Sequence, residues 1–345
     1  MSSKSNKLTR RDFLKLSGMG VAGVLLGGTA NAYLNKYKQK IADVTILRET
    51  SYNSNLTDTL LRGINNYPNV LQKIKGGRVV LKPNLVDFYK SVPVNTDPAM
   101  VAAAIAAFRT LGASEVIVGE GPGHNRDMEM ILEQSGFDGV LKDDKVRFVD
   151  LNLDSISPVN LVSNYTGLSQ LYFPNTILGA DLVVSMPKMK AHHWAGATLS
   201  LKNLFGTIPG IKYGWPKNFL HWHGIMQSIA DISTTLNPGF AIVDGIVGME
   251  GDGPLSGAAV NSGAIVMGEN LTAVDATAAR IMGFHPEQIQ YLMLMVKHGG
   301  TANEARIRQL GESIADMQQD FATPPKSEFL KEKASIWISA IYSGW

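Results

Sequence analysis

Short apolar runs alternate along the chain with longer segments whose apolar residues recur at helical spacing. The runs are typical of buried strands, and the longer segments end at Gly or begin at a capping residue such as Asp97. The pattern predicts strands at 44–47, 78–82, 115–118, 146–150, 181–185, 241–243 and 264–267. It predicts helices at 56–74, 98–112, 128–134 and 271–282.

The order of these elements, strand then helix then strand, is typical of βαβ units. It predicts an α/β fold: a mostly parallel sheet with helices on both faces and Gly-rich turns at the strand carboxyl ends forming a cleft. We expect one large domain over 42–315. Residues 316–345 are more polar and are expected to form a C-terminal tail or a packing arm.

Charge along the chain is concentrated at its start. The whole sequence carries a formal charge of +2, but residues 1–32 hold five cations and one anion. Removing that segment's net charge of +4 leaves −2 for the remainder, so the main part has no electrostatic footprint for nucleic acid. We therefore expect a small-molecule ligand and no nucleic-acid partner.

The chain contains no cysteine. This excludes disulfides, thiolate nucleophiles and any iron–sulfur cluster ligated by this chain. A bound metal would need His, carboxylate or backbone ligands, or a bound organic cofactor.

The first 32 residues have the order of an export signal. Arg10 and Arg11 form a twin-arginine motif, a weakly apolar segment follows at 16–28, and Ala30-Asn31-Ala32 is a small-residue cleavage site. The apolar segment is short for a membrane span of about 20 residues. We expect a twin-arginine translocase to export the protein to a periplasmic or other extracytoplasmic location, with a membrane association only if the signal is kept uncleaved.

Polar, Gly-rich turns follow several of the predicted strands, at 82–84, 119–124, 188–193 and 244–253. Ligands bind at the carboxyl ends of strands in parallel α/β sheets. Each turn alone is weak evidence, whereas their recurrence favours a site. The carboxylates of the last turn could bind a hard cation, although a solvated loop is the more common explanation.

Residues 188–224 hold four of the seven histidines and five lysines. His is suited to proton transfer near neutral pH and to metal binding. His221 and His223 would share a face on a strand and diverge on a helix. Four lysines could supply cationic groups for an anionic ligand: Lys82, Lys188, Lys190 and Lys202. Together with Asn84 and Asn203, they are the predicted cofactor-binding residues.

Several common motifs are absent from the sequence. Gly119, Gly121 and Gly123 do not have the spacing of the dinucleotide fingerprint, and Pro122 occupies a position where a helix N-terminus would offer amides. A Rossmann dehydrogenase is therefore disfavoured. The chain also lacks a P-loop, a Ser-centred hydrolase elbow and an HExxH motif.

Four motifs together resemble the domain-of-unknown-function family 362, over roughly residues 42–300. They are Val80-Leu81-Lys82-Pro83-Asn84-Leu85, Ser185-Met186-Pro187-Lys188-Met189-Lys190-Ala191-His192, Ser200-Leu201-Lys202-Asn203-Leu204-Phe205-Gly206, and the stretch 244–254. The family implies no established activity. Some members carry a ferredoxin-like module, which a chain without cysteine lacks.

A more distant resemblance is to the N-terminal domain of nickel-pincer lactate racemases. The shared order is Lys82-Pro83, Gly123-His124, His193-Trp194-Ala195-Gly196, Lys202, 208–210 and then His221 or His223. The resemblance implies that Lys202 holds a nickel-pincer-type nucleotide or another metal cofactor, and that His221 or His223 binds the metal. It implies that His124 acts in proton transfer with His192 or His193. Here the lysine has no neighbouring Arg, unlike the racemase pattern.

Two functions follow as hypotheses. The first is an exported enzyme, an isomerase or oxidoreductase, that binds a cofactor or metal and acts on a small molecule such as a hydroxy acid. The second is a non-catalytic protein that binds an anionic ligand or assists a redox partner. A third, purely structural interpretation of the turns predicts that Lys202→Ala costs stability alone.

Overall fold

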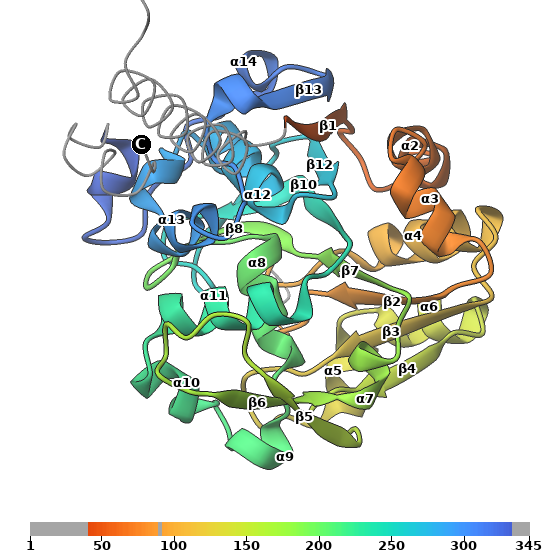
Figure 1. Ribbon diagram of the computed structural model, residues 1–345. Coiled ribbons are helices and arrows are strands. Elements are labelled where there is room, and N and C mark those ends of the chain that lie inside the picture. Colours follow the sequence, from red (N-terminus) through yellow and green to blue (C-terminus); the bar gives the residue numbers. More distant parts are fainter. Residues whose placement is uncertain (1–40, 89–91, 333–345) are drawn as a thin grey trace, which may run out of the picture. The chain divides into compact units, whose positions relative to one another are not determined.

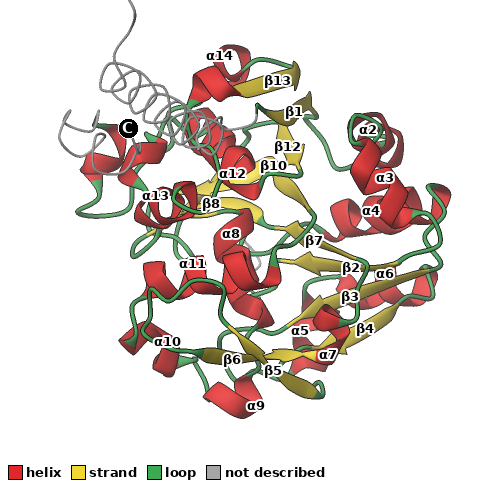
Figure 2. Ribbon diagram, viewed as in Figure 1, coloured by secondary structure: helices red, strands yellow, loops and turns green. Residues whose placement is uncertain are grey.

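A mixed sheet of eleven strands forms the centre of the fold (Figures 1 and 2). The computed structural model describes residues 41–88 and 92–332. Eight strands follow one another in the order β13-β1-β12-β10-β7-β2-β3-β4. Their bounds are β1 Ala42–Arg48, β2 Arg78–Pro83, β3 Glu115–Glu120, β4 Arg147–Asp150, β7 Leu182–Met186, β10 Phe240–Glu250, β12 Ala264–Gly268 and β13 Ile307–Gly311.

Most neighbouring strands of this sheet are parallel. The exception along the path is β12, which runs antiparallel to both β1 and β10. Strands β8 (Lys188–His192) and β11 (Ala258–Val260) also pair with β10, and β9 (Gly196–Thr198) pairs with β8. A separate hairpin is formed by β5 (Ile156–Asn160) and β6 (Gln170–Pro174). The mostly parallel α/β sheet predicted from the sequence is confirmed.

Helices cover both faces of the sheet, as Figure 2 shows. The α-helices are α2 Leu56–Ile64, α3 Pro68–Ile74, α4 Pro98–Thr110, α5 Met128–Gln134, α6 Phe137–Asp143, α7 Asn175–Leu178, α8 Ser200–Asn203, α9 Gly210–Tyr213, α10 Asn218–Trp222, α11 Ile225–Leu236, α12 Leu271–Ile281, α13 Gln290–Val296 and α14 Ile314–Met317. The 3₁₀ helices are η1 Leu204–Thr207, η2 Pro286–Gln288, η3 Glu304–Arg306 and η4 Glu328–Lys331. None of the helices in the described ranges is long and apolar enough to cross a membrane.

The core is divided by the sheet, because successive side chains of a strand point to opposite faces. Along β2, Val79 and Leu81 pack with α4, whereas Val80 packs in a different cluster. Along β10, Ala241 and Val243 join the cluster that contains α11 and α12. The sheet is thus buried on both faces, which explains why its strands read as continuous apolar runs.

The structure differs from two predicted elements. The helix predicted at 56–74 is divided into α2 and α3, because Pro68 has no N–H for a continuing helix and instead begins α3. The strand predicted at 241–243 is only the start of β10, which extends to Glu250. The two glycines at 245 and 248 hid this extension, although close packing against Met189 and Phe321 explains both.

The described part of the C-terminal stretch packs against the domain. Met317, Phe321 and Leu330 are buried in the same cluster as β10 and α12. The backbone N–H of Phe321 donates to the carbonyl of Met282 at 3.1 Å. The predicted export signal at 1–32 and the last residues of the predicted segment 316–345 lie outside the described residues.

Candidate functional site

A pocket of about 420 Å³ lies where β2, β3 and β8 end. Residues far apart in the sequence line it, from Lys82 to Ser256. The turns that follow β2 and β3 provide one part of the lining, and the segment 190–221 provides another. This is the strand-end location that the recurrent polar turns predicted.

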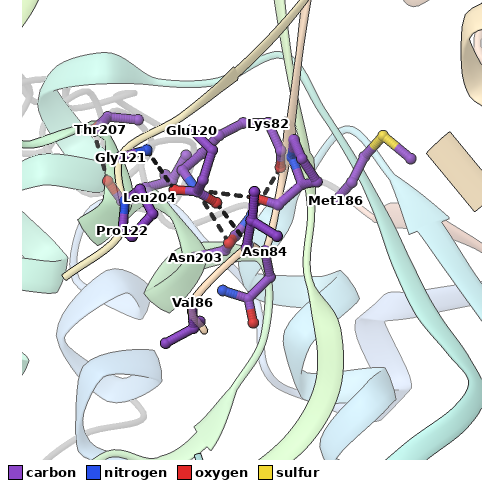
Figure 3. Close-up of polar contacts among 12 residues, drawn as sticks. Lys82, Asn84, Val86, Glu120, Gly121, Pro122, Met186, Asn203, Leu204 and Thr207 are labelled. Atoms are coloured by element: carbon purple, nitrogen blue, oxygen red, sulfur yellow. Dashed lines mark hydrogen bonds and ion pairs between the residues drawn. The ribbon is translucent and has the colours of Figure 1, made fainter. Parts of the chain in front are cut away.

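Two of the lining residues, Lys82 and Glu120, form a buried ion pair, which Figure 3 shows. Lys82 Nζ lies 2.7 and 2.8 Å from the two carboxylate oxygens of Glu120, at the ends of β2 and β3. The Glu120 carboxylate also accepts from the backbone N–H groups of Leu85 and Gly121. Because both ions are almost fully buried and every oxygen is bonded, this pair fixes the positions of the two turns.

Asn203 connects the ion pair to α8. Its Oδ1 accepts from Lys82 Nζ at 3.2 Å, and its Nδ2 donates to the carbonyl of Lys82 at 2.9 Å. Asp275 of α12 in turn accepts from the backbone N–H groups of Ser200 at 2.7 Å and Leu201 at 3.0 Å. Those amides begin α8 and have no partner within the helix, so Asp275 caps the segment that carries Lys202 and Asn203.

Three further lysines line the pocket. Lys190 Nζ donates to the carbonyl of Val94 at 2.7 Å, and Lys217 Nζ donates to the carbonyl of Gly121 at 2.7 Å. Lys202 Nζ lies 4.8 Å from the centre of the Phe205 ring. Lys190 and Lys217 are fully buried. The described contacts of these three amines are with neutral groups.

Burial lowers the pKa of every one of these amines. Desolvation lowers the pKa of Lys217 to about 7 and that of Lys202 to about 8, and the other lysines add repulsion. The pKa of Lys190 is lowered well below its ordinary value by desolvation and by the charge of Lys202. For Lys82 the lowering of the pKa by desolvation is opposed by Glu120. The lysines are therefore poised to change protonation when an anion arrives.

His192 is held as a neutral hydrogen-bond donor. Its Nδ1 accepts from the backbone N–H groups of Trp194 at 3.1 Å and Ala195 at 3.2 Å, which requires Nδ1 to be unprotonated. Burial and the neighbouring cations, Lys202 first among them, hold its pKa well below the ordinary value. His192 therefore carries its proton on Nε2.

His193 and His221 have the opposite arrangement. The Nδ1 of His193 lies 2.7 Å from the carbonyl of Gly253, and the Nδ1 of His221 lies 3.2 Å from that of Lys217. Since a carbonyl only accepts, each Nδ1 carries a proton, and in the neutral ring the lone pair is on Nε2. Burial lowers the pKa of His221, which favours this neutral form. Trp194 lies between the two rings, with centroids 4.9 and 5.7 Å away.

The structure brings most of the predicted residues together. Of the eleven, the pocket lining contains nine: Lys82, Asn84, His124, Lys190, His192, His193, Lys202, Asn203 and His221. Lys188 instead pairs with Asp244 of β10, with Nζ 2.6 Å from the carboxylate. The Tyr52 hydroxyl donates to the same carboxylate and accepts from Lys188 Nζ. His223 contacts the carbonyl of Thr166 and the ring of Phe219. Neither of these two side chains lines the pocket.

His221 and His223 diverge because the segment is helical. His221 lies in α10, and His223 is the residue that ends this helix. In the described part of the chain, no group of three or more His, Cys, Asp or Glu side chains is arranged to hold a metal ion. A metal bound here by protein ligands alone does not fit these residues. A metal-bearing cofactor would have His221 and Lys202 available, and it stays a prediction.

Three site residues were not singled out in the sequence, namely Glu120, Lys217 and Asp275. Glu120 had a sequence signal, since it ends a strand inside a polar turn already recognised. Lys217 follows a Gly-Trp-Pro turn and has a φ of 67°, a strained conformation that is common at binding sites. Asp275 lies inside α12 and caps a different helix, α8. Nothing in the local sequence indicates that role.

Comparison with known proteins places the chain in a family. A sequence model described as a domain of unknown function (DUF362) matches residues 79–280. The chain belongs to this family. A thylakoid-associated protein of Synechocystis sp., sll1697, is 24% identical over 261 residues, which cover 72% of this chain and 77% of that protein. The family resemblance predicted from the four motifs is confirmed.

A solved structure with a similar fold is the lactate racemase apoprotein from Thermoanaerobacterium thermosaccharolyticum. The match has a TM-score of 0.42 and 14% sequence identity. It covers 69% of this chain and 57% of the racemase chain. The expected distant resemblance to lactate racemases is therefore found, and what the pocket does must be argued from its own residues.

Proposed function

We propose that the pocket binds a small organic anion of the hydroxy-acid type and transfers a proton on it. The observation that carries this proposal is the lysine content of the lining. Lys82, Lys190, Lys202 and Lys217 enter one pocket, whereas Glu120 is its one buried carboxylate. An opposite charge within about 4–6 Å of an amine raises the pKa of that amine. A bound anion would thus relieve the cost of burying these groups.

Asn84 supports a ligand that carries a hydroxyl group. It is 7% exposed, and its Oδ1 has no hydrogen-bond partner in the described residues. Figure 3 shows its amide pointing away from the Lys82–Glu120 pair. A buried acceptor without a partner is costly, and a ligand O–H would satisfy it.

The histidines support proton transfer. His193 has Nε2 as its free ring nitrogen, held in that tautomer by Gly253, and is the base in this proposal. His192 donates from Nε2 and would stabilise negative charge that develops on the ligand. His124 is exposed at the mouth of the same pocket, where it could exchange protons with solvent. A cofactor held by Lys202 and His221 would supply hydride transfer if one is bound.

Proton exchange at carbon tests the proposal. We expect protein purified from its own host to bind L-lactate or glycolate and to exchange the proton on the carbon that bears the hydroxyl in D₂O, measured by NMR. His193→Gln should abolish exchange and retain binding, because the lysines remain. The matched control is His285→Gln, which changes a half-buried histidine outside the pocket.

The outcomes separate the two functions. Binding without exchange by the native protein would favour a non-catalytic anion-binding protein. Absence of binding to these acids and to their phosphorylated analogues would contradict the proposed ligand class altogether.

We also propose that the chain is exported by the twin-arginine route. Its support is the order of Arg10, Arg11, the apolar segment and Ala30-Asn31-Ala32. In a bacterium that has this translocase, Arg10→Lys with Arg11→Lys should retain the full chain in the cytoplasm. Lys7→Arg is the matched control and should leave export intact. Equal distribution of all three proteins between fractions would contradict export by this route.

A further inference from the structure

Three amines of the pocket have no acidic partner among the described residues. Lys190 contacts the carbonyls of Val94 and Pro254, Lys217 contacts the carbonyl of Gly121, and Lys202 contacts the ring of Phe205. A carbonyl oxygen accepts a hydrogen bond but carries no net charge. The contacts therefore hold Lys190 and Lys217 in place without neutralising them.

The acidic side chains of the lining cannot fill this role. Glu120 is occupied by Lys82 and by the backbone N–H groups of Leu85 and Gly121. Asp252 is 55% exposed at the rim, beside His193 at 3.8 Å. Asp150 lies outside the lining, and its charge favours the protonated form of Lys217. Of the four lysines in the lining, Lys82 pairs with a buried carboxylate, and the other three have no such pair among the described residues.

The three amines also belong to different parts of the pocket. Lys190 lies on β8, and the carbonyls of Val94 in the loop after β2 and Pro254 in the turn after β10 hold its amine. Lys217 precedes α10, and the carbonyl of Gly121 in the turn after β3 holds its amine. The two amines are thus fixed by different turns of the pocket. A ligand with a single charge would therefore leave at least one region unneutralised.

We propose that the ligand of this pocket carries at least two negative charges, one for the region of Lys190 and one for the region of Lys217. This inference rests on the proposed function, because it specifies the anion that the pocket takes. The shared chemistry is a small hydroxylated dianion, either a dicarboxylate or a phosphomonoester. A hydroxy monocarboxylate fills only one of the two regions.

Binding of such a dianion should take up protons. The pKa values of Lys202 and Lys217 are lowered to about 8 and about 7, so part of each amine population is neutral at pH 8. A nearby negative charge raises these pKa values, and each amine that becomes protonated takes its proton from the buffer. A dianion contacts more of these amines than a monoanion and should cause the larger uptake.

Calorimetry at pH 8 and constant ionic strength tests the inference, with the full chain and three probes: L-lactate, L-malate and sn-glycerol 3-phosphate. We expect at least one dianion to bind about tenfold or more tightly than L-lactate, since raising one amine pKa by a unit corresponds to a factor of ten. Titrations in Tris and in HEPES give the number of protons taken up, which should be larger for that dianion. The two dianions distinguish a dicarboxylate site from a phosphomonoester site.

Lysine variants localise the effect. Lys190→Met and Lys217→Met should each reduce the affinity for the dianion by a larger factor than the affinity for L-lactate, because each removes one of the two cationic regions. Lys142→Met removes an exposed lysine of α6 and is the control that should change neither affinity. The melting temperature of each variant shows whether it is folded.

The results distinguish this inference from the proposed function. If L-lactate binds as tightly as both dianions, with equal proton uptake, the inference is overturned and the proposed anion site stands. If the dianion preference persists in both folded lysine variants, the assignment to these amines is overturned. If none of the three probes binds, the proposed function fails as well. The comparison of the three probes uses the native protein alone. It therefore tests the inference even if a lysine variant fails to fold.

Discussion

At the scale of single residues, the ion pair of Lys82 and Glu120 has the largest energetic consequence in the pocket. Both side chains are almost fully buried, and the other described contacts of Lys82 Nζ are neutral: the carbonyl of Pro83 and Oδ1 of Asn203. A buried pair is expensive to form but far more expensive to break, because one charge is left without compensation. The pair therefore determines whether the turns after β2 and β3 keep their positions.

Glu120→Gln should lower the free energy of unfolding by about 3–5 kcal/mol, because it leaves the Lys82 ammonium buried without a counter-charge. Urea denaturation of the variant and the native protein measures this loss. Lys82→Met combined with Glu120→Gln removes both charges and should be clearly more stable than Glu120→Gln alone. A double variant that is less stable than the single one would contradict this explanation.

At Gly206 the backbone lies very close to the Lys82–Glu120 ion pair. A Cβ at this position would lie 2.6 Å from Lys82 Nζ and closer still to Glu120. A Cβ at Gly123, in the same pocket lining, would contact nothing within 4 Å. A side chain at position 206 would thus clash with the ion pair, so packing requires glycine there. No such clash requires glycine at position 123 of the predicted Gly-rich turn.

At the scale of elements, the position of α8 depends on a carboxylate from α12. Asp275 accepts from the first two backbone N–H groups of α8, and α8 carries both Lys202 and Asn203. A helix of four residues has too few internal hydrogen bonds to be stable alone. The cap from Asp275 is therefore what presents Lys202 to the pocket.

Asp275→Asn should destabilise the protein more at pH 5 than at pH 8. Burial raises the pKa of Asp275 from 3.8 to about 7, so the folded state keeps its proton while the unfolded state loses it. The stabilisation from Asp275 is complete below about pH 4 and declines as the pH rises to about 7, by at most about 1.4 kcal/mol per pH unit. Asn has no proton to lose and shows no such decline.

Denaturation at the two pH values measures this difference. The matched control is Asn270→Ala, which removes a cap of α12 that does not titrate and should cost about 1 kcal/mol at either pH. A loss for Asp275→Asn that is equal at pH 5 and pH 8, or larger at pH 8, would contradict the raised pKa.

The elements could be predicted from the sequence where local rules decide them. Apolar runs between Gly and Pro located β2 and β3, and Asp97 before Pro98 located the start of α4. The rules failed where distant residues decide the structure. The glycines in β10 read as a loop because the side chains that pack against them come from Met189 and Phe321.

The sequence also predicted part of the candidate site correctly. A run of His and Lys at 188–224 identified the right segment, but Lys188 and His223 belong to other networks. Whether a lysine points into a pocket or to a buried aspartate depends on which strands pair, and the sequence does not show this. The sequence located the turn that contains Glu120, but the pairing of Glu120 with Lys82 depends on β2 and β3 being neighbours in the sheet.

At the scale of the whole molecule, the pocket and the family match coincide. The residues that line the pocket lie between Lys82 and Ser256, inside the matched range of 79–280. Strands β1 and β13 and the segment 316–332 lie outside it. The pocket thus lies within the part of the chain that the family model matches, and β1 and β13 extend the sheet outside that part.

The segment after α14 stabilises the end of β10 near the pocket. Phe321 is buried against Gly248, and the N–H of Ala322 donates to the carboxylate of Glu250 at 2.7 Å. The N–H of Gly251 donates to the carbonyl of Ala322 at 2.8 Å. The turn that follows Gly251 supplies Gly253, whose carbonyl holds His193.

Phe321→Ala should lower the free energy of unfolding by about 3–5 kcal/mol, because it leaves a cavity between this segment and β10. Phe329 lies in the same segment but is 45% exposed, so Phe329→Ala is the matched control and should change stability by no more than about 0.5 kcal/mol. Urea denaturation measures both losses. If the segment only covered the surface, the two substitutions would have similar small effects. A large loss confined to Phe321→Ala would mean that residues outside the family match stabilise the fold by packing against β10.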